Sequence, residues 1–237
     1  MTMLEQILVE NRAYFHPVVP LQPGKDKLVQ LHFTQENRAL TEDVLGNTNK
    51  FTDYINATLE KADARFGIGG YGEYRTIYSR SEIFGSAQGQ SEPRRFHLGI
   101  DIWGKPCTHV MAPLDGFVHS FAFRESFGDY GAVIILTHQL DGYSFYTLYG
   151  HLSLASIKNL QEGARIKKGE VFAEFGIPQE NGSWPPHLHF QIIKDLEGMK
   201  GDYPGVCRYS EKEKYLSNCP NPDMILCLNQ FLPQENN

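Results

Sequence analysis

The chain has 237 residues, of which 41% are hydrophobic and 12% aromatic, so it can bury a substantial core and is not expected to be disordered. Its formal net charge of −6 and the lack of a basic block argue against binding to nucleic acid or to an anionic membrane. No run approaches the ~18 consecutive apolar residues that a membrane-spanning helix needs.

The N-terminal residues do not resemble a signal peptide. They carry Glu5 and Glu10 and lack a basic start followed by a long apolar stretch. We therefore expect a cytoplasmic protein. A cell-envelope or extracellular location is the alternative if a signal was trimmed or if export is non-classical.

Residues 1–80 form a predicted N-terminal extension that differs in texture from the rest of the chain. Residues 3–13 predict a short amphipathic helix, and residues 28–33 (LVQLHF) predict a short strand. Between residues 41 and 64, apolar side chains recur at near-helical spacing, which predicts one or two helices. These side chains are Val44, Phe51, Ile55 and Leu59.

A glycine-rich stretch, FGIGGYGEYR, occupies residues 66–75. Its glycines resemble those of a dinucleotide-binding loop, but the full G-x-G-x-x-G pattern is absent and no strand is predicted before it. We interpret it as a flexible, tyrosine-rich loop. A tyrosine between Tyr71 and Tyr78 is a candidate for lining a cleft.

From about residue 95 to residue 195 the sequence predicts short strands bounded by glycine, proline or Asp-Gly turns. No long helical pattern separates them, which favours an antiparallel sheet or sandwich over a parallel sheet. The predicted strands are residues 116–123, 132–137, 144–151, 165–175 and 187–193. Residues 81–197 are thus the predicted main domain, and the fold class is mainly β.

The last segment, residues 198–237, predicts a loop-rich tail with a short helix at 210–216. It contains Cys207, Cys219 and Cys227, and the fourth cysteine is Cys107. No C-x-x-C pair indicates a structural zinc ribbon. One disulfide is the alternative in an oxidising compartment, but without a readable export signal we favour free thiols packed in a C-terminal cluster.

Three of the chain's nine histidines stand out by their spacing to other polar side chains, and a fourth by its position. In HLGID, both an extended chain and a helix bring His97 and Asp101 to one face, with Leu98, Ile100 and Ile102 opposite in the extended case. In HLHF, His187 and His189 share one face of a strand. His151 ends an aromatic-rich strand. Two further histidines are expected to face solvent: His119, at odd parity within the predicted strand 116–123, and His138, at a strand end.

Histidine nitrogens and a carboxylate oxygen are the ligands that zinc prefers, and three such ligands with an open fourth position are typical of a catalytic site. Non-haem iron(II) also uses two histidines and one carboxylate, but its oxygenases typically draw the first pair from an H-x-D/E motif, which is absent here. The pattern therefore predicts one catalytic Zn²⁺.

Four stretches, in this order, resemble the lysostaphin/LytM-type zinc metallopeptidases, which are peptidoglycan endopeptidases. The stretches are HLGIDIWGKPCTHVMAPLDGFV, GAVIILTHQLDGYSFYTLYGHLS, EGARIKKGEVFAEFG and PPHLHFQI, and together they cover roughly 100 residues. The resemblance implies a LytM/lysostaphin-type antiparallel β domain (the duplicated hybrid motif). It implies that His97, Asp101 and His189 bind zinc, and that His151 and His187 are the catalytic histidines that do not bind it.

The resemblance further implies hydrolysis of peptide bonds in peptidoglycan stem peptides or cross-bridges, or in soluble muropeptides. The substrate is then the expected partner, and the oligomeric state stays open. The alternative is a non-catalytic, zinc-containing binding or regulatory domain of the same fold. The N-terminal extension has no counterpart in the resemblance; we favour plain packing on the sheet over occlusion of the cleft. A biotinyl/lipoyl-type carrier is disfavoured because no Met-Lys-Met hairpin tip is present.

Overall fold

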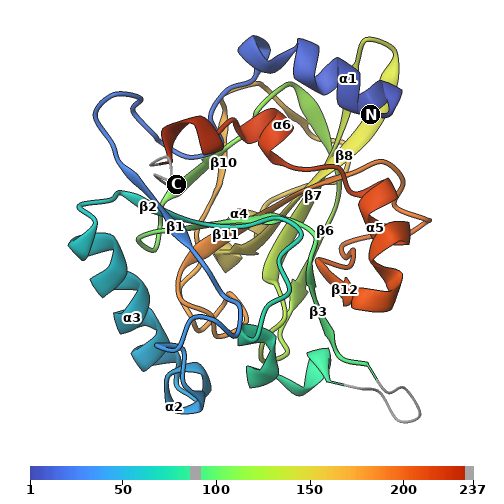
Figure 1. Ribbon diagram of the computed structural model, residues 1–237. Coiled ribbons are helices and arrows are strands. Elements are labelled where there is room, and N and C mark those ends of the chain that lie inside the picture. The colour runs from blue at the N-terminus through green and yellow to red at the C-terminus, as the bar shows by residue number, and fades with distance from the viewer. Residues whose placement is uncertain (86–91, 233–237) are drawn as a thin grey trace.

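A computed structural model describes residues 1–85 and 92–232 of the chain (Figure 1). An eight-stranded sheet crosses the molecule in the order β1-β2-β4-β11-β8-β7-β6-β9. Only β1 and β2 pair in parallel; the other neighbours are antiparallel. The strands are β1 Leu28–Leu31, β2 Phe66–Gly69, β4 Ile100–Trp103, β6 Gly116–Arg124, β7 Gly131–Leu140, β8 Tyr143–Leu152, β9 Arg165–Ile166 and β11 His187–Ile193. The predicted mainly β class with a large antiparallel sheet is confirmed.

Two small antiparallel sheets, six α-helices and five short 3-10 helices complete the described structure. β5 (His109–Met111) pairs with β10 (Val171–Glu174), and β3 (Arg94–His97) pairs with β12 (Val206–Arg208). In Figure 1 the first and last helices lie side by side at one edge of the molecule, and the second and third lie at another. The helices are α1 Met3–Glu10, α2 Glu42–Gly46, α3 Thr48–Lys61, α4 Leu154–Ile157, α5 Lys212–Asn218 and α6 Asp223–Leu226.

The middle of the large sheet, along β4 and β11, is buried on both faces. Along β11, Leu188, Phe190 and Ile192 point into the main hydrophobic core, which also receives Ile100 and Ile102 of β4. Since side chains alternate along a strand, the residues between them point to the opposite face. That opposite face carries the polar side chains His187, His189 and Gln191 of the same strand, all of them buried.

Two smaller hydrophobic clusters lie outside the main core. One gathers around Trp103, Phe33 and Phe51 at the end where α3 packs. The other contains Val133, Leu148 and the C-terminal tail. Polar residues of β4, β8 and β11 lie between these clusters, so the candidate site is walled by apolar side chains on either side.

The N-terminal helices form where expected, for identifiable local reasons. Thr2 and Glu5 make a reciprocal capping box at the start of α1. Asn47 caps α3 by accepting hydrogen bonds from the amides of residues 49 and 50. Phe51, Ile55 and Leu59 then recur at every fourth position and form the buried face of that helix.

The prediction of a loop for residues 66–75 is wrong over its first part. Phe66–Gly69 is strand β2, buried throughout, which pairs with β1 on one side and with β4 on the other. The glycines misled the prediction, because they serve close packing rather than flexibility. An added Cβ at Gly67 would overlap the Leu31 side chain, so the strand can approach its neighbour only without side chains there.

Other boundaries also differ from the predictions. The single strand predicted at 165–175 is two strands, β9 and β10, in different sheets, separated by the turn at Gly169, whose φ is +76°. His138 is buried, not solvent-facing: its Nδ1 bonds the Asp115 carbonyl oxygen and its Nε2 lies 2.7 Å from Thr147 Oγ1. His119 is half-buried.

All four cysteines are free thiols in the structure, as favoured. The single C-terminal cluster is only partly right. Cys207 and Cys219 share a buried cluster, whereas Cys227 lies apart, against the N-terminal segment that contains Arg12 and Phe15. Burial raises the pKa of Cys207 and of Cys219 to about 12, so both are inert thiols at neutral pH.

Among residues 1–85 and 92–232, none of the helices combines the length and the apolar character required to cross a bilayer.

Candidate metal centre and cleft

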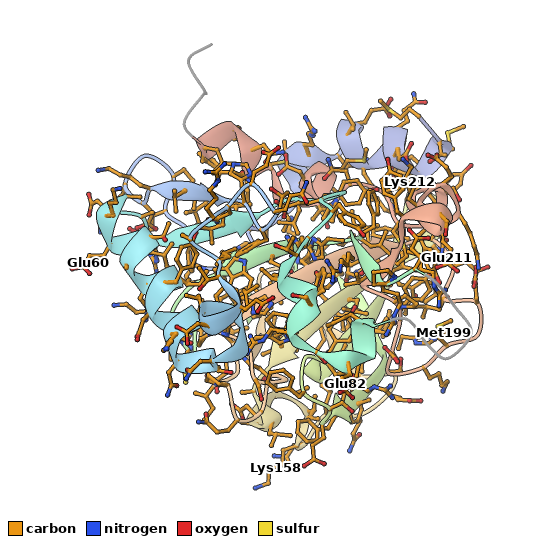
Figure 2. The ribbon with its side chains drawn as sticks, turned by 60° about the horizontal axis from the view of Figure 1, so that its bottom comes forward. Glu60, Glu82, Lys158, Met199, Glu211 and Lys212 are labelled. Carbon is orange, nitrogen blue, oxygen red and sulfur yellow. The ribbon has the colours of Figure 1, made fainter. Side chains whose placement is uncertain are left out.

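Neighbouring strands bring most of the predicted site residues together. β11 carries His187 and His189 and lies between β4 and β8 in the sheet. Asp101 of β4 is directly opposite His189. On the other side, His151 follows the residue of β8 that pairs with His189. Charged side chains such as Glu60 lie at the outline of the molecule (Figure 2), whereas these four are at most 7% exposed.

His97 reaches the same point from another sheet. It ends β3, and the chain bends at Leu98 and Gly99 before β4 begins. A Cβ at Gly99 would lie 2.6 Å from Nε2 of His189, so the bend needs glycine. Residues 97–101 are thus neither a helix nor one continuous extended strand, the two geometries considered from the sequence, and Leu98 packs in a different cluster from Ile100. His97 and Asp101 nevertheless converge, as predicted.

Three atoms meet in this cluster, at separations typical of ligands around one ion. Nε2 of His97 lies 3.0 Å from Nδ1 of His189. Oδ1 of Asp101 lies 3.0 Å from that same Nδ1 and 3.2 Å from Nε2 of His97. Zinc–ligand bonds of about 2.0–2.1 Å in tetrahedral geometry imply ligand separations of roughly 3.3 Å.

In each of the two histidines, one ring nitrogen points away from the cluster (the outward nitrogen) and the other points into it. If the outward nitrogen carries the proton, the inward nitrogen carries a lone pair. Nδ1 of His97 donates to the carbonyl oxygen of Gly70, 2.9 Å away. Nε2 of His189 lies 2.9 Å from Oε1 of Gln191. The amide of Gln191 is oriented by the Pro204 carbonyl, which can only accept and therefore faces Nε2 of Gln191. His189 consequently donates to Gln191.

With both outward nitrogens protonated, each histidine presents an unprotonated nitrogen to the other and to the carboxylate of Asp101. Three lone pairs within hydrogen-bond distance repel one another unless a cation lies among them. Histidine nitrogens with a carboxylate oxygen are a zinc donor set, and each outward nitrogen has the partner that orients such ligands. The residues present therefore fit a zinc ion, with His97, Asp101 and His189 as its holders.

The electrostatics of the cluster support the same protonation states. Burial would raise the pKa of the Asp101 carboxyl, but neighbouring His97 and the Arg75 guanidinium hold it well below its usual range. Burial, reinforced by Arg75, lowers the pKa of His97 to about 4. At neutral pH the cluster thus holds an ionised carboxylate and an imidazole with a free lone pair, as a metal ligand requires.

His151 and His187 form a second histidine pair beside the first. Their ring centroids are 4.1 Å apart, and His187 also stacks on Trp103 at 3.9 Å. Nδ1 of His151 donates to the carbonyl oxygen of Asn181, and Nδ1 of His187 donates to that of Pro185, both over 2.8 Å. Each ring therefore keeps Nε2 as its basic nitrogen.

Both rings of this pair are neutral at pH 7. Burial lowers the pKa of His187 to about 4, and burial with the adjacent His187 ring lowers that of His151 well below its usual value. Two neutral imidazoles with free Nε2 atoms can each accept a proton and release it again, which is the requirement for general acid–base work.

His151 also has an unusual backbone. Its φ is +63°, in the left-handed region that non-glycine residues seldom occupy. The conformation is held from outside the strand: the amide of His151 donates to the Tyr130 carbonyl, and its carbonyl accepts from the amide of Gly176. Strain of this kind persists where the surrounding structure fixes it, and it clusters at functional sites.

A cavity of about 450 Å³ opens onto these side chains. Its wall includes the three polar rings His151, His187 and His189, together with Asp101. Tyr78 also lines it, as anticipated for a tyrosine of the 71–78 stretch. Further out the wall carries charges of both signs, from Arg94, Arg124, Asp129 and Asp202.

A comparison with known protein families tests the predicted resemblance. Residues 95–201 match the model described as Peptidase family M23. The chain is similar to this family over that segment. The matched segment contains all five predicted site residues, and the predicted resemblance is confirmed over it.

Two curated relatives match parts of the same region. One is an uncharacterized metalloprotease of Haemophilus influenzae strain Rd, 36% identical over 98 residues, which are 41% of this chain and 18% of that protein. The other is an L-Ala--D-Glu endopeptidase of Bacillus subtilis strain 168, 27% identical over 126 residues, which are 51% of this chain and 36% of that protein. The chain thus spans about a fifth and about a third of these relatives.

Among solved structures, the chain is similar to the catalytic domain of the antimicrobial peptidase lysostaphin from Staphylococcus simulans. The sequence identity is 21%, the alignment covers 69% of this chain and 96% of that one, and the TM-score is 0.40. A zinc-containing peptidase from Vibrio cholerae is similar over 41% of this chain and 27% of that one, at 25% identity and a TM-score of 0.33.

Sequence reasoning missed the side chains that support the five residues. Arg75 bonds Asp101, Gln191 bonds His189, and Trp103 stacks on His187. Gln191 and Trp103 had a detectable signal, because alternation along β4 and β11 places them on the same face as Asp101 and His189. Arg75 had none, since it lies outside the sheet in the stretch taken for a loop.

Proposed function

We propose that this chain is a zinc-dependent endopeptidase that hydrolyses peptide bonds in peptidoglycan stem peptides or cross-bridges, or in soluble muropeptides. One observation carries the proposal: three converging lone pairs that fit a zinc ion lie beside two neutral histidines, and all of these residues except the fully buried His97 line one cavity. Similarity of the matched segment to a peptidase family supports the reaction class.

Zinc held by His97, Asp101 and His189 would polarise the scissile carbonyl and lower the pKa of a water molecule to about 7. The chain's own residues do the remaining work. His151 or His187 accepts the proton of the attacking water at Nε2 and returns it to the departing amine. Because the carbonyls of Asn181 and Pro185 hold the Nδ1 protons, each ring presents the same nitrogen throughout.

The charged side chains in the cavity wall favour one class of substrate. Arg124 lies 3.2 Å from Asp202 and 3.6 Å from Asp129, and all three side chains are partly exposed. A peptide that carries both carboxylate and ammonium groups, as peptidoglycan stem peptides with diamino acids do, matches such a wall better than oligoglycine does. We therefore rank stem peptides and muropeptides above glycine cross-bridges.

The test is hydrolysis of defined substrates by the zinc-loaded chain, followed by mass spectrometry. The substrates are muropeptides, cross-linked stem peptides, oligoglycine and an unrelated peptide. His151→Ala and a chelated sample should be inactive, and His109→Ala, at an exposed histidine of β5, should retain activity. Stoichiometric zinc without cleavage of any substrate would instead support the zinc-containing binding or regulatory domain.

A further inference from the structure

The segment from Gly69 to Arg75 precedes the family-matched residues, yet it lies against two of the three zinc-holding side chains. The amide of Gly72 donates to the His97 carbonyl, and the amide of His97 donates to the Glu73 carbonyl. The amide of Arg75 donates to the Arg95 carbonyl. These backbone bonds, with an isolated antiparallel bridge between Tyr74 and Phe96, hold the segment beside β3 and next to the metal cluster.

Arg75 is the centre of this arrangement. Its side chain is fully buried, and its Nη1 donates to Oδ2 of Asp101, the carboxylate oxygen that does not face the two histidines. Nη2 donates to the Gly70 carbonyl oxygen at 3.1 Å, and Nε donates to Oε2 of Glu73 at 2.7 Å. A buried arginine with this many partners is held in one geometry.

The same carbonyl oxygen links the two ligands. Gly70 accepts from Arg75 and also from Nδ1 of His97. Glu73, 10% exposed at its side chain, offsets the charge of Arg75 and is itself held by the amide of Phe33. Arg75, Glu73 and the Gly70 carbonyl therefore fix the orientation of both Asp101 and His97.

Gly69 supplies the space for the guanidinium group. It lies opposite Asp101 in the sheet, and an added Cβ there would be 2.8 Å from Nη2 of Arg75. The glycine-rich stretch thus has a specific packing reason: a side chain at position 69 would displace the arginine from the carboxylate.

We propose that Arg75 is a positioning residue of the metal centre, which holds Asp101 as a one-oxygen zinc ligand and is seated by Gly69 and Glu73. The proposal rests on the proposed zinc site. With Oδ2 occupied by Arg75, only Oδ1 is available to the ion. If Arg75 is removed, both oxygens are free, and the carboxylate can rotate or bind through both.

The experiment compares four variants with the wild-type full chain: Arg75→Met, Arg75→Lys, Gly69→Ala and Arg80→Met. Arg80 is the matched control, a partly buried arginine five residues further along the chain that packs over Phe51 and Trp184. Zinc affinity is measured by competition with a chromophoric chelator, coordination by the visible spectrum of the Co²⁺ form, and folding by melting of the metal-free protein.

Removal of a side chain that orients a metal ligand typically costs 10–100-fold in metal affinity. We expect that loss for Arg75→Met, together with a weaker Co²⁺ absorption as the coordination number rises. Arg75→Lys should recover part of the affinity, since an ammonium can pair with Asp101 but cannot also reach Glu73 and Gly70. Gly69→Ala should behave like Arg75→Met, and Arg80→Met like the wild type.

The outcomes separate this proposal from the one on which it rests. If the wild type binds no zinc, the proposed function fails. If the wild type binds zinc and Arg75→Met binds it within threefold, with an unchanged Co²⁺ spectrum, the positioning role is overturned. If Arg75→Met does not fold, Gly69→Ala and Arg75→Lys decide, because both keep a cation in the buried segment.

Discussion

Gln191 offers a quantitative test of how the outer hydrogen bonds govern the metal centre. Its side chain is fully buried: Oε1 accepts from Nε2 of His189 over 2.9 Å, and Nε2 donates to the Pro204 carbonyl over 3.1 Å. In Gln191→Leu, which has a similar shape, Nε2 of His189, the Pro204 carbonyl and Sγ of Cys219 all lose their bond to this side chain. His189 then has a choice between two protonation patterns that the wild type does not offer.

Without zinc, the proton of His189 in the variant moves to Nδ1, because Oδ1 of Asp101 lies 3.0 Å from that atom and can accept it. Zinc binding must reverse this shift and leave a buried N–H at Nε2 without a partner. An unsatisfied buried donor costs about 1–3 kcal/mol. We therefore expect zinc affinity to fall by roughly 5–150-fold, at 1.4 kcal/mol for each factor of ten.

The assay is competition for zinc with a chromophoric chelator at pH 7, with metal-free and zinc-loaded melting as a second readout. At saturating zinc, the stabilisation of the variant by the metal should be smaller than that of the wild type by the same ~1–3 kcal/mol. Gln139→Leu, the same change at an exposed position of β7, is the matched control. A zinc affinity of Gln191→Leu within twofold of the wild type would refute the reasoning about the tautomer.

Three further predictions concern two histidines with different roles. His151→Ala should lower turnover by about 10²–10⁴-fold while zinc affinity stays within threefold, as measured by single-turnover cleavage and chelator competition; a loss of zinc would contradict a non-ligand role. Because φ at this position is +63°, His151→Gly should also exceed His151→Ala in unfolding free energy by about 0.5–1 kcal/mol in urea titrations. His138 should contribute to acid sensitivity: burial lowers its pKa to about 4 against an ordinary value of 6.5, so the unfolded chain takes up the proton first as the pH falls. The contribution of His138 to stability is intact above pH 6.5 and declines by about 3 kcal/mol towards pH 4, at 1.36 kcal/mol per pH unit. In urea titrations of the metal-free protein, the unfolding free energy of His138→Gln should therefore fall less steeply over that pH range than that of the wild type. Equal slopes of unfolding free energy against pH would contradict this prediction.

Much of the fold followed from local sequence signals. The strand predicted at residues 187–193 coincides with β11. Polar and apolar side chains alternate along these residues, and strict alternation indicates a strand rather than a helix. The four-residue spacing of Phe51, Ile55 and Leu59 likewise predicts the buried face of α3. Where the prediction failed, at Phe66–Gly69 and at residues 165–175, glycine had a packing or turn role that local patterns cannot distinguish.

The site was predictable to the same extent, and for a related reason. Spacing within single strands reveals residues that converge through strand pairing, as with Asp101 opposite His189. It cannot reveal a side chain that reaches the site from a segment added outside the sheet. Arg75 and the Gly70 carbonyl are of that kind, since their contacts with Asp101 and His97 depend on a backbone path set by β2 and by the amide bonds to β3.

Residues on both sides of the family-matched segment contribute to the metal centre. The family-matched residues 95–201 contain every predicted ligand and also Gln191, but other groups that orient the ligands come from both flanks. Gly70 and Arg75 precede the segment, while Pro204, which fixes the Gln191 amide, follows it. Gly205 lies on the same side, where an added Cβ would be 3.0 Å from Nε2 of His189. Because ligand orientation controls metal affinity, changes in either flank should tune zinc binding without touching a ligand.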